Sequence, residues 1–279
     1  MNRPCWDAQQ TYESIERYFE KLPASTETID ISRYNLLRCP PINKFTNLKR
    51  FHCEFNELVE LPELPDSLEA LVCYCNNLKT INRFPSSLRW LNGSHNWIEH
   101  LPNFPPNIGH VDLFKNCLQT LPALPQNALL YLNVGRNDLK ELPPLPGNLG
   151  GLCCESNHLE TIPPLPERLR ELRCEYNPIK QMPLLPDQLC QLEIEHTTIY
   201  DTVLQADHID MIKLRINTLY HFRVTYYTRK YGWIWRNWLW MKVRLPKILQ
   251  ANHPHRLQQA LQENDDLEVV METFGIETY

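Results

Sequence analysis

The sequence predicts a solenoid of short stacked turns, with a parallel β-sheet along its concave face. Asparagine recurs every 20 or 21 residues, and apolar residues return in the same frame around each copy. Prolines cluster between the copies, so that 21 of the 23 prolines lie at or before Pro186. A fixed short period of this kind is typical of repeat architectures. The recurring residues are Asn56, Asn76, Asn96, Asn116, Asn137, Asn157 and Asn177.

Each copy begins with a segment whose pattern predicts a β-strand. Val111 and Leu113 alternate with polar residues, so both side chains point to one face of a strand and into the solenoid. Asn116 follows where the chain turns away. Its amide can donate to and accept from backbone groups that the turn leaves unpaired. We therefore expect the seven asparagines to form a buried ladder.

Each copy ends with a proline-rich segment, such as the LPxLP run from Leu142 to Pro146. A repeat of 20 residues leaves little length for a returning helix. Proline fixes φ and favours an extended, polyproline-like path. The convex side is therefore predicted to be extended rather than helical.

The repeat array is predicted to span residues 22–200, as about nine repeats of 20–22 residues. Its two terminal copies are imperfect, with Tyr34 and Thr197 in the asparagine position, as expected for repeats that face a cap. Residues 1–21 carry apolar residues at helical spacing and are predicted to form an N-terminal helical cap. Residues 201–279 are predicted to form a basic, tryptophan-rich helical region that caps the other end.

The pattern LxxLxLxxNxL is the leucine-rich-repeat signature. The segments LPELPDSLEALVCYCNNL and LPALPQNALLYLNVGRNDL resemble the short bacterial-type repeats of secreted effector proteins. Similar arrays occur in proteins of large DNA viruses. This resemblance implies a leucine-rich-repeat solenoid, and it carries no site with it because function belongs to sites rather than folds.

Residues that flank the core positions are predicted to line the concave face. This face is expected to be aromatic in the early and middle repeats and acidic in the late ones. Aromatic side chains that do not reach the core are typical of binding surfaces, whereas the acidic part could equally be a solvated face. The candidate partner-binding residues are Phe55, Tyr74, Trp90, His95, His110, Phe114, Tyr131, Glu155, Glu175, Tyr176 and Glu195.

No metal site and no cofactor are predicted. The histidines lack a metal-ligand spacing, and no phosphate-binding or nucleophile motif occurs. Several of the ten cysteines, including Cys53 and Cys73, occupy core positions and are expected to be buried free thiols. We expect a reducing, intracellular setting, which would be the host cytoplasm for a viral protein. Neither a signal peptide nor a transmembrane segment is expected.

The C-terminal region differs in composition from the array. Residues 211–262 contain ten lysines and arginines and no acidic residue, although the whole chain has a net charge of −5. This segment could be a helical cap, a surface for nucleic acid or another anionic partner, or an amphipathic membrane-surface element. Its candidate residues are Arg229, Lys230, Trp233, Arg236, Trp240, Lys242 and Arg244. The segment WIWRNWLWMKVRLPKI and the acidic end that follows resemble a C-terminal tail of giant-virus proteins.

These observations favour a non-enzymatic scaffold that binds a protein of unknown identity on its concave face. Bacterial effectors with such repeats can carry a C-terminal ubiquitin ligase domain with a cysteine nucleophile, but Cys190 is the last cysteine here. The alternative is binding of nucleic acid or an anionic surface through the basic tryptophan-rich segment.

Overall fold

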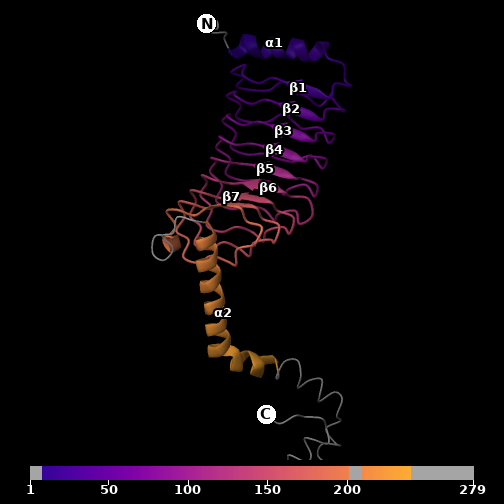
Figure 1. Cartoon of the computed structure of the whole chain (residues 1–279). Helices are drawn as coiled ribbons and strands as arrows, with labels where there is room; N and C mark the ends of the chain where they lie inside the picture. The colour runs from indigo at the N-terminus through magenta and orange to yellow at the C-terminus, as the bar shows by residue number, and fades with distance from the viewer. Residues whose placement is uncertain (1–7, 201–208, 240–279) are drawn as a thin grey trace, which may run out of the picture. The chain divides into compact units, whose positions relative to one another are not determined.

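The computed structural model describes residues 8–200 and 209–239, and it confirms the predicted leucine-rich-repeat solenoid. Nine three-residue strands form one parallel sheet in which spatial order follows chain order (Figure 1). Neighbouring strands pair in register, so that Leu71 lies beside Leu91 and Leu91 beside Val111. The elements are α1 Ala8–Lys21, β1 Thr28–Asp30, β2 Arg50–His52, β3 Ala70–Val72, β4 Trp90–Asn92, β5 His110–Asp112, β6 Tyr131–Asn133, β7 Gly151–Cys153, β8 Glu171–Arg173, β9 Gln191–Glu193 and α2 Ile209–Leu239.

The core runs along the whole array as stacked rows of apolar side chains. The central residue of each strand from β1 to β8 is buried, as is the apolar residue two positions later, for example Val111 and Leu113. Cys53, Cys73, Cys154 and Cys174 occupy four positions of the second of these rows and are fully buried free thiols. Burial raises the pKa of the Cys73 thiol to about 12, so these thiols act as small apolar side chains.

The convex side is extended, as the prolines predict. No helix occurs between the described strands of the array. A tight turn then leads into the next strand, and in most repeats a proline carbonyl accepts a hydrogen bond from a buried residue three positions later. Examples are Leu68 N to Pro65 O and Leu149 N to Pro146 O, both at 3.1 Å. Proline suits this position because its missing N–H is not needed and its fixed φ lowers the entropy lost on folding.

The seven recurrent asparagines are buried where each strand ends. The amide of Asn116 shows the common pattern: its Oδ1 accepts from Ile98 N in the preceding repeat at 3.0 Å. Its Nδ2 donates to Gly93 O in that repeat and to Leu113 O in its own. Each asparagine therefore joins two successive repeats, and its side-chain oxygen accepts from a buried backbone N–H that would otherwise be unpaired.

Helix α1 covers the first repeat. Ile15 and Phe19 are buried against it, and the Phe19 ring meets the Phe45 ring edge-on at 5.6 Å. The Lys44 ammonium donates to carbonyls at the C-terminal end of α1, including Leu22 O at 3.3 Å. Cations stabilise this end of a helix because its carbonyls are unpaired and carry partial negative charge.

The first turns of α2 contact the last repeats. Ile212 and Ile216 are buried, and the Asn217 side chain pairs with both backbone groups of Leu185. The chain divides into two compact units, residues 1–220 and 221–279, so these contacts lie within the first unit. The boundaries at residues 21 and 200 that the sequence suggests remain predictions. Within the described residues, neither helix is long and apolar enough to span a bilayer.

Candidate functional site

The concave face carries a continuous stack of aromatic rings in the middle repeats. The Trp90 and His110 rings are parallel, with centroids 3.6 Å apart, and the Tyr131 ring stacks on the other side of His110 at 4.7 Å. The three residues are register partners on β4, β5 and β6. Parallel strands in register bring equivalent residues to about 4.8 Å, which is close to a stacking distance. We call Trp90, His110 and Tyr131 the aromatic row.

The row is fixed by its own contacts and remains accessible at one end. Trp90 is 47% exposed, whereas His110 and Tyr131 are half-buried. Burial between two rings lowers the pKa of His110, so its neutral form is favoured. The Tyr131 hydroxyl lies 3.5 Å from Cys153 Sγ. The face thus presents a preformed apolar surface whose side chains need little further ordering on binding.

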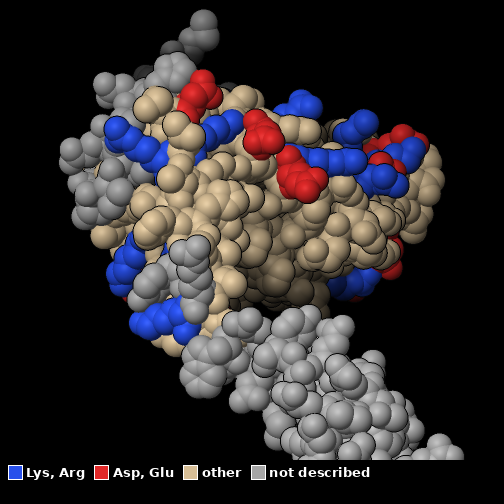
Figure 2. All heavy atoms as spheres, turned by 60° about the horizontal axis from the view of Figure 1, so that its bottom comes forward, with Lys and Arg blue, Asp and Glu red and all other residues tan. Residues whose placement is uncertain are grey.

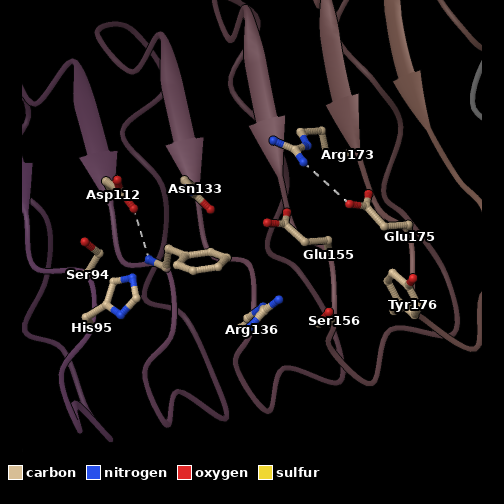
Figure 3. Close-up of a pocket in the computed structure, with 11 residues that line it drawn as sticks. Ser94, His95, Asp112, Asn133, Arg136, Glu155, Ser156, Arg173, Glu175 and Tyr176 are labelled. Carbon is tan, nitrogen blue, oxygen red and sulfur yellow. Dashed lines mark hydrogen bonds and ion pairs between the residues drawn. The ribbon is translucent and has the colours of Figure 1, made fainter.

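A polar pocket of about 390 Å³ lies on the concave face (Figure 3), and its residues Asp112 and Asn133 belong to the strands that carry His110 and Tyr131. Its residues come from the ends of β4 to β8 and from the turns that follow. Five of the predicted face residues meet there, namely His95, Phe114, Glu155, Glu175 and Tyr176. The remaining lining residues are Ser94, Asp112, Asn133, Arg136, Ser156 and Arg173.

Two carboxylates of the pocket are buried. Glu155 and Glu175 are each only 8% exposed, and the Oε2 atom of each is buried without a hydrogen-bond partner. Burial raises the pKa of both carboxyls, and Glu155 and Glu193 raise the pKa of Glu175 further. The interpretation of the late acidic residues as a solvated face therefore fits the exposed Glu195 but not Glu155 or Glu175.

Glycine creates the space that Glu155 occupies. Gly135 holds the equivalent position of the preceding repeat, and a Cβ atom placed there would lie 2.5 Å from Glu155 Cδ. The Glu155 side chain therefore lies over Gly135. This arrangement directs the carboxylate along the face toward the middle of the pocket (Figure 3).

Arginines provide the opposite charge in the pocket. Arg173 Nε lies 3.1 Å from Glu193 Oε2, and its Nη2 lies 3.7 Å from Glu175 Oε1. The Arg136 guanidinium lies 5.5 Å from the centroid of the Phe114 ring. The face residues predicted from the sequence did not include Arg136, Asp112 or Asn133. Asp112 and Asn133 could have been found as polar residues at the end of a predicted strand. The side-chain oxygen of each accepts a hydrogen bond from the backbone N–H two residues later.

The residue before each ladder asparagine has a left-handed backbone conformation. This row includes Phe55, His95, Arg136 and Tyr176, with φ between 53° and 56°. A non-glycine residue is disfavoured there by about 1–2 kcal/mol. The conformation is held by hydrogen bonds to the next repeat, such as His95 N to Phe114 O at 2.7 Å. These side chains consequently stand at the rim of the face.

The other predicted face residues lie apart from the pocket. Phe55 and Tyr74 contact each other edge-on at 5.0 Å in the early repeats, and the Arg33 guanidinium lies 4.4 Å from the Phe55 centroid. The exposed Glu195 belongs to the last repeat. Figure 2 shows acidic and basic side chains mixed along one edge of the visible face rather than separated by sign.

The basic tryptophan-rich segment is described only in part. Arg229, Lys230, Trp233 and Arg236 lie within α2, and Lys230 is exposed with its ammonium 5.4 Å from the Tyr231 centroid. Trp240, Lys242 and Arg244 lie outside the described residues. Among the described residues, no group of three histidine, cysteine or acidic side chains could hold a metal ion.

Comparisons with solved structures support the leucine-rich-repeat fold of this chain. It is similar to the structure of YopM, a leucine-rich effector protein from Yersinia pestis, with 36% identity and a TM-score of 0.60 over 62% of this chain and 49% of that one. YopM from Yersinia enterocolitica gives 30% identity and a TM-score of 0.51 over 63% and 48%. This chain therefore aligns with about half the length of the YopM structures.

The leucine-rich-repeat domain of APL1B gives 16% identity and a TM-score of 0.54, over 70% of this chain and 75% of that domain. This likeness concerns the fold alone. No protein-family model matches the chain, and no curated protein matches it. A solenoid of this class is typically a non-enzymatic interaction scaffold, because its curvature creates an extended concave binding surface.

Proposed function

We propose that this protein is a non-enzymatic scaffold that binds a protein partner on its concave face. The observation that carries the proposal is the aromatic row, which presents a 47% exposed Trp90 on a stack fixed by His110 and Tyr131. Tryptophan and tyrosine are enriched among the residues that dominate binding energy at interfaces. Because the stack is already ordered, binding would cost little side-chain entropy.

The face also provides specificity around this apolar anchor. The polar pocket brings Glu155, Glu175, Arg136 and Arg173 together on the same face as the aromatic row. Charged groups at an interface select the partner and fix its orientation more than they add affinity. The combination of an aromatic anchor and a charged pocket supports a protein partner.

Partner capture by full-length variants tests the proposal. Trp90→Ala and Phe114→Ala should each weaken capture, and the double variant should abolish it, while the far-ultraviolet circular dichroism stays unchanged. Arg50→Ala is a matched control, since Arg50 is exposed at the position of β2 equivalent to Trp90. Undiminished capture by the double variant would exclude the concave face as the binding surface.

The biological setting is also part of the proposal. The similarity to YopM supports an effector-like role, and the resemblance of the C-terminal segment to giant-virus tails suggests a viral origin. We propose an intracellular, reducing environment, because the nine cysteines in the described residues are free. Thiol labelling of the protein isolated from its native source tests this, as full labelling after denaturation is expected and protected thiols would contradict it.

A second candidate function is binding of nucleic acid or an anionic surface through the basic segment. Helix α2 contains six lysines and arginines but one acidic residue, Asp210. Phosphate binding of this kind should weaken steeply as salt rises, because counterions are released on binding. A titration with fluorescent single-stranded DNA tests it, and absence of binding at low salt would dismiss this candidate.

A further inference from the structure

The pocket contains acceptor atoms that lack donors. Oε2 of Glu155 and Oε2 of Glu175 are buried without a hydrogen-bond partner, and both residues are more than nine-tenths buried. An ionised carboxylate only accepts hydrogen bonds. Leaving such an atom buried and unpaired costs free energy that a bound donor would recover.

The cations already present do not supply these donors. Arg173 directs Nε and Nη2 to Glu193 at 3.1 Å, and its nearest Glu175 contact is 3.7 Å to Oε1 rather than Oε2. Arg136 lies over the Phe114 ring. The lining therefore holds three carboxylates, those of Asp112, Glu155 and Glu175, against two guanidinium groups.

We propose that this pocket receives an arginine side chain of the partner protein, with Glu155 and Glu175 as its acceptors. This inference rests on the proposed function and specifies the chemistry of the partner. The two glutamates occupy equivalent positions of successive repeats, so their backbones lie about 4.8 Å apart. A planar guanidinium can donate to two carboxylates at once, whereas an ammonium is a point donor.

The surrounding residues fit a guanidinium as well. Tyr176 is 57% exposed at the pocket rim, and its ring stacks on His196 at 4.5 Å, which leaves a ring face beside the acidic pair. Guanidinium groups stack on aromatic faces. The array already uses this chemistry internally, since Arg173 bridges Glu175 and Glu193 and Arg33 lies over Phe55.

The test is a nuclear magnetic resonance titration of the full chain with N-acetyl-arginine amide at neutral pH. The side-chain carboxyl resonances of Glu155 and Glu175 should shift and saturate with a millimolar dissociation constant. N-acetyl-citrulline amide, which has the same shape without the charge, should cause no saturable shift. Glu155→Gln and Glu175→Gln should each weaken binding about tenfold or more, which corresponds to about 1.4 kcal/mol. The matched control Glu195→Gln, in the same row but exposed, should bind as the wild type does.

Three results would overturn the inference: no saturable binding of the arginine probe, equal binding of the citrulline probe, or preference for N-acetyl-glutamate amide. Its failure is separable from that of the proposed function, because Trp90 does not line the pocket. Trp90→Ala should leave the arginine titration unchanged while it reduces partner capture. If arginine does not bind but Trp90→Ala still reduces capture of the partner, the proposed scaffold function is supported and the proposed arginine pocket is wrong.

Discussion

Replacing Asn116 with alanine should destabilise the array, and the hydrogen bonds allow the size of the effect to be worked out. The Ile98 N–H donates to Asn116 Oδ1 at 3.0 Å, and no other acceptor of this N–H is present among the described contacts. Its burial without a partner costs about 1–3 kcal/mol. The Gly93 and Leu113 carbonyls lose less, because each keeps a second amide donor, from Asn96 and Asn137 respectively.

Each of these two lost hydrogen bonds contributes about 0.5–1 kcal/mol net. The sum predicts a loss of about 2–5 kcal/mol from the free energy of unfolding, which is a large part of the roughly 5–15 kcal/mol of a typical domain. Urea denaturation followed by circular dichroism measures it. Lys115→Ala is the control, since Lys115 precedes Asn116 and is exposed. A loss below about 1 kcal/mol, or equal losses in the two variants, would refute the ladder as the source of stability.

Three further changes test the core and the pocket. Leu113→Asp should unfold the array or lower its thermal midpoint strongly, because Leu113 is fully buried and the charge would have no partner. Equal midpoints for Leu113→Asp and Lys115→Ala would contradict the assignment of repeat positions to the core and to the surface. Glu155→Gln should raise the midpoint at neutral pH, because burial raises the pKa of this carboxyl and the native protein gains stability as the carboxyl protonates. Gly135→Ala should change stability little but displace the Glu155 carboxylate, so that arginine binding weakens.

The controls for these changes differ. The advantage of Glu155→Gln should disappear when the pH falls below the ordinary pKa of glutamate, because wild-type Glu155 is then neutral in both the native and the unfolded state. An advantage that persists at acidic pH would show that charge burial is not its cause. For Gly135→Ala, unchanged shifts of the Glu155 carboxyl resonance on mutation would contradict the close approach of Glu155 to Gly135.

The fold was predictable because its determinants are local and repeated. One copy, with Val111, Leu113 and Asn116 at fixed spacing, specifies a strand, a core row and a turn, and in-register stacking extends these features along the chain. The left-handed conformation before each asparagine was missed. Residues as different as His95, Arg136 and Tyr176 adopt it, so no residue type signals it, and hydrogen bonds to the next repeat impose it.

The candidate site was predictable as a face but not as a pocket. The frame placed Glu155 and Glu175 on the concave side, whereas their burial depends on what neighbouring repeats place beside them. Glu155 is covered because Gly135 leaves room for it, and Arg173 turns toward Glu193. Such relations join residues 20 positions apart through side-chain packing, and a pattern read one repeat at a time does not contain them.

The asparagine ladder also gives the array a direction. Each asparagine accepts a hydrogen bond from the repeat before it, as Asn177 does from Leu159. During synthesis a new turn is therefore incomplete until the following turn emerges. Shortening the protein therefore has unequal consequences at its two ends. Deletion of repeats from the C-terminal side removes the asparagine oxygen that accepts from a buried backbone N–H of the last remaining repeat. Deletion from the N-terminal side leaves the side-chain amide of the first remaining asparagine, which water can satisfy.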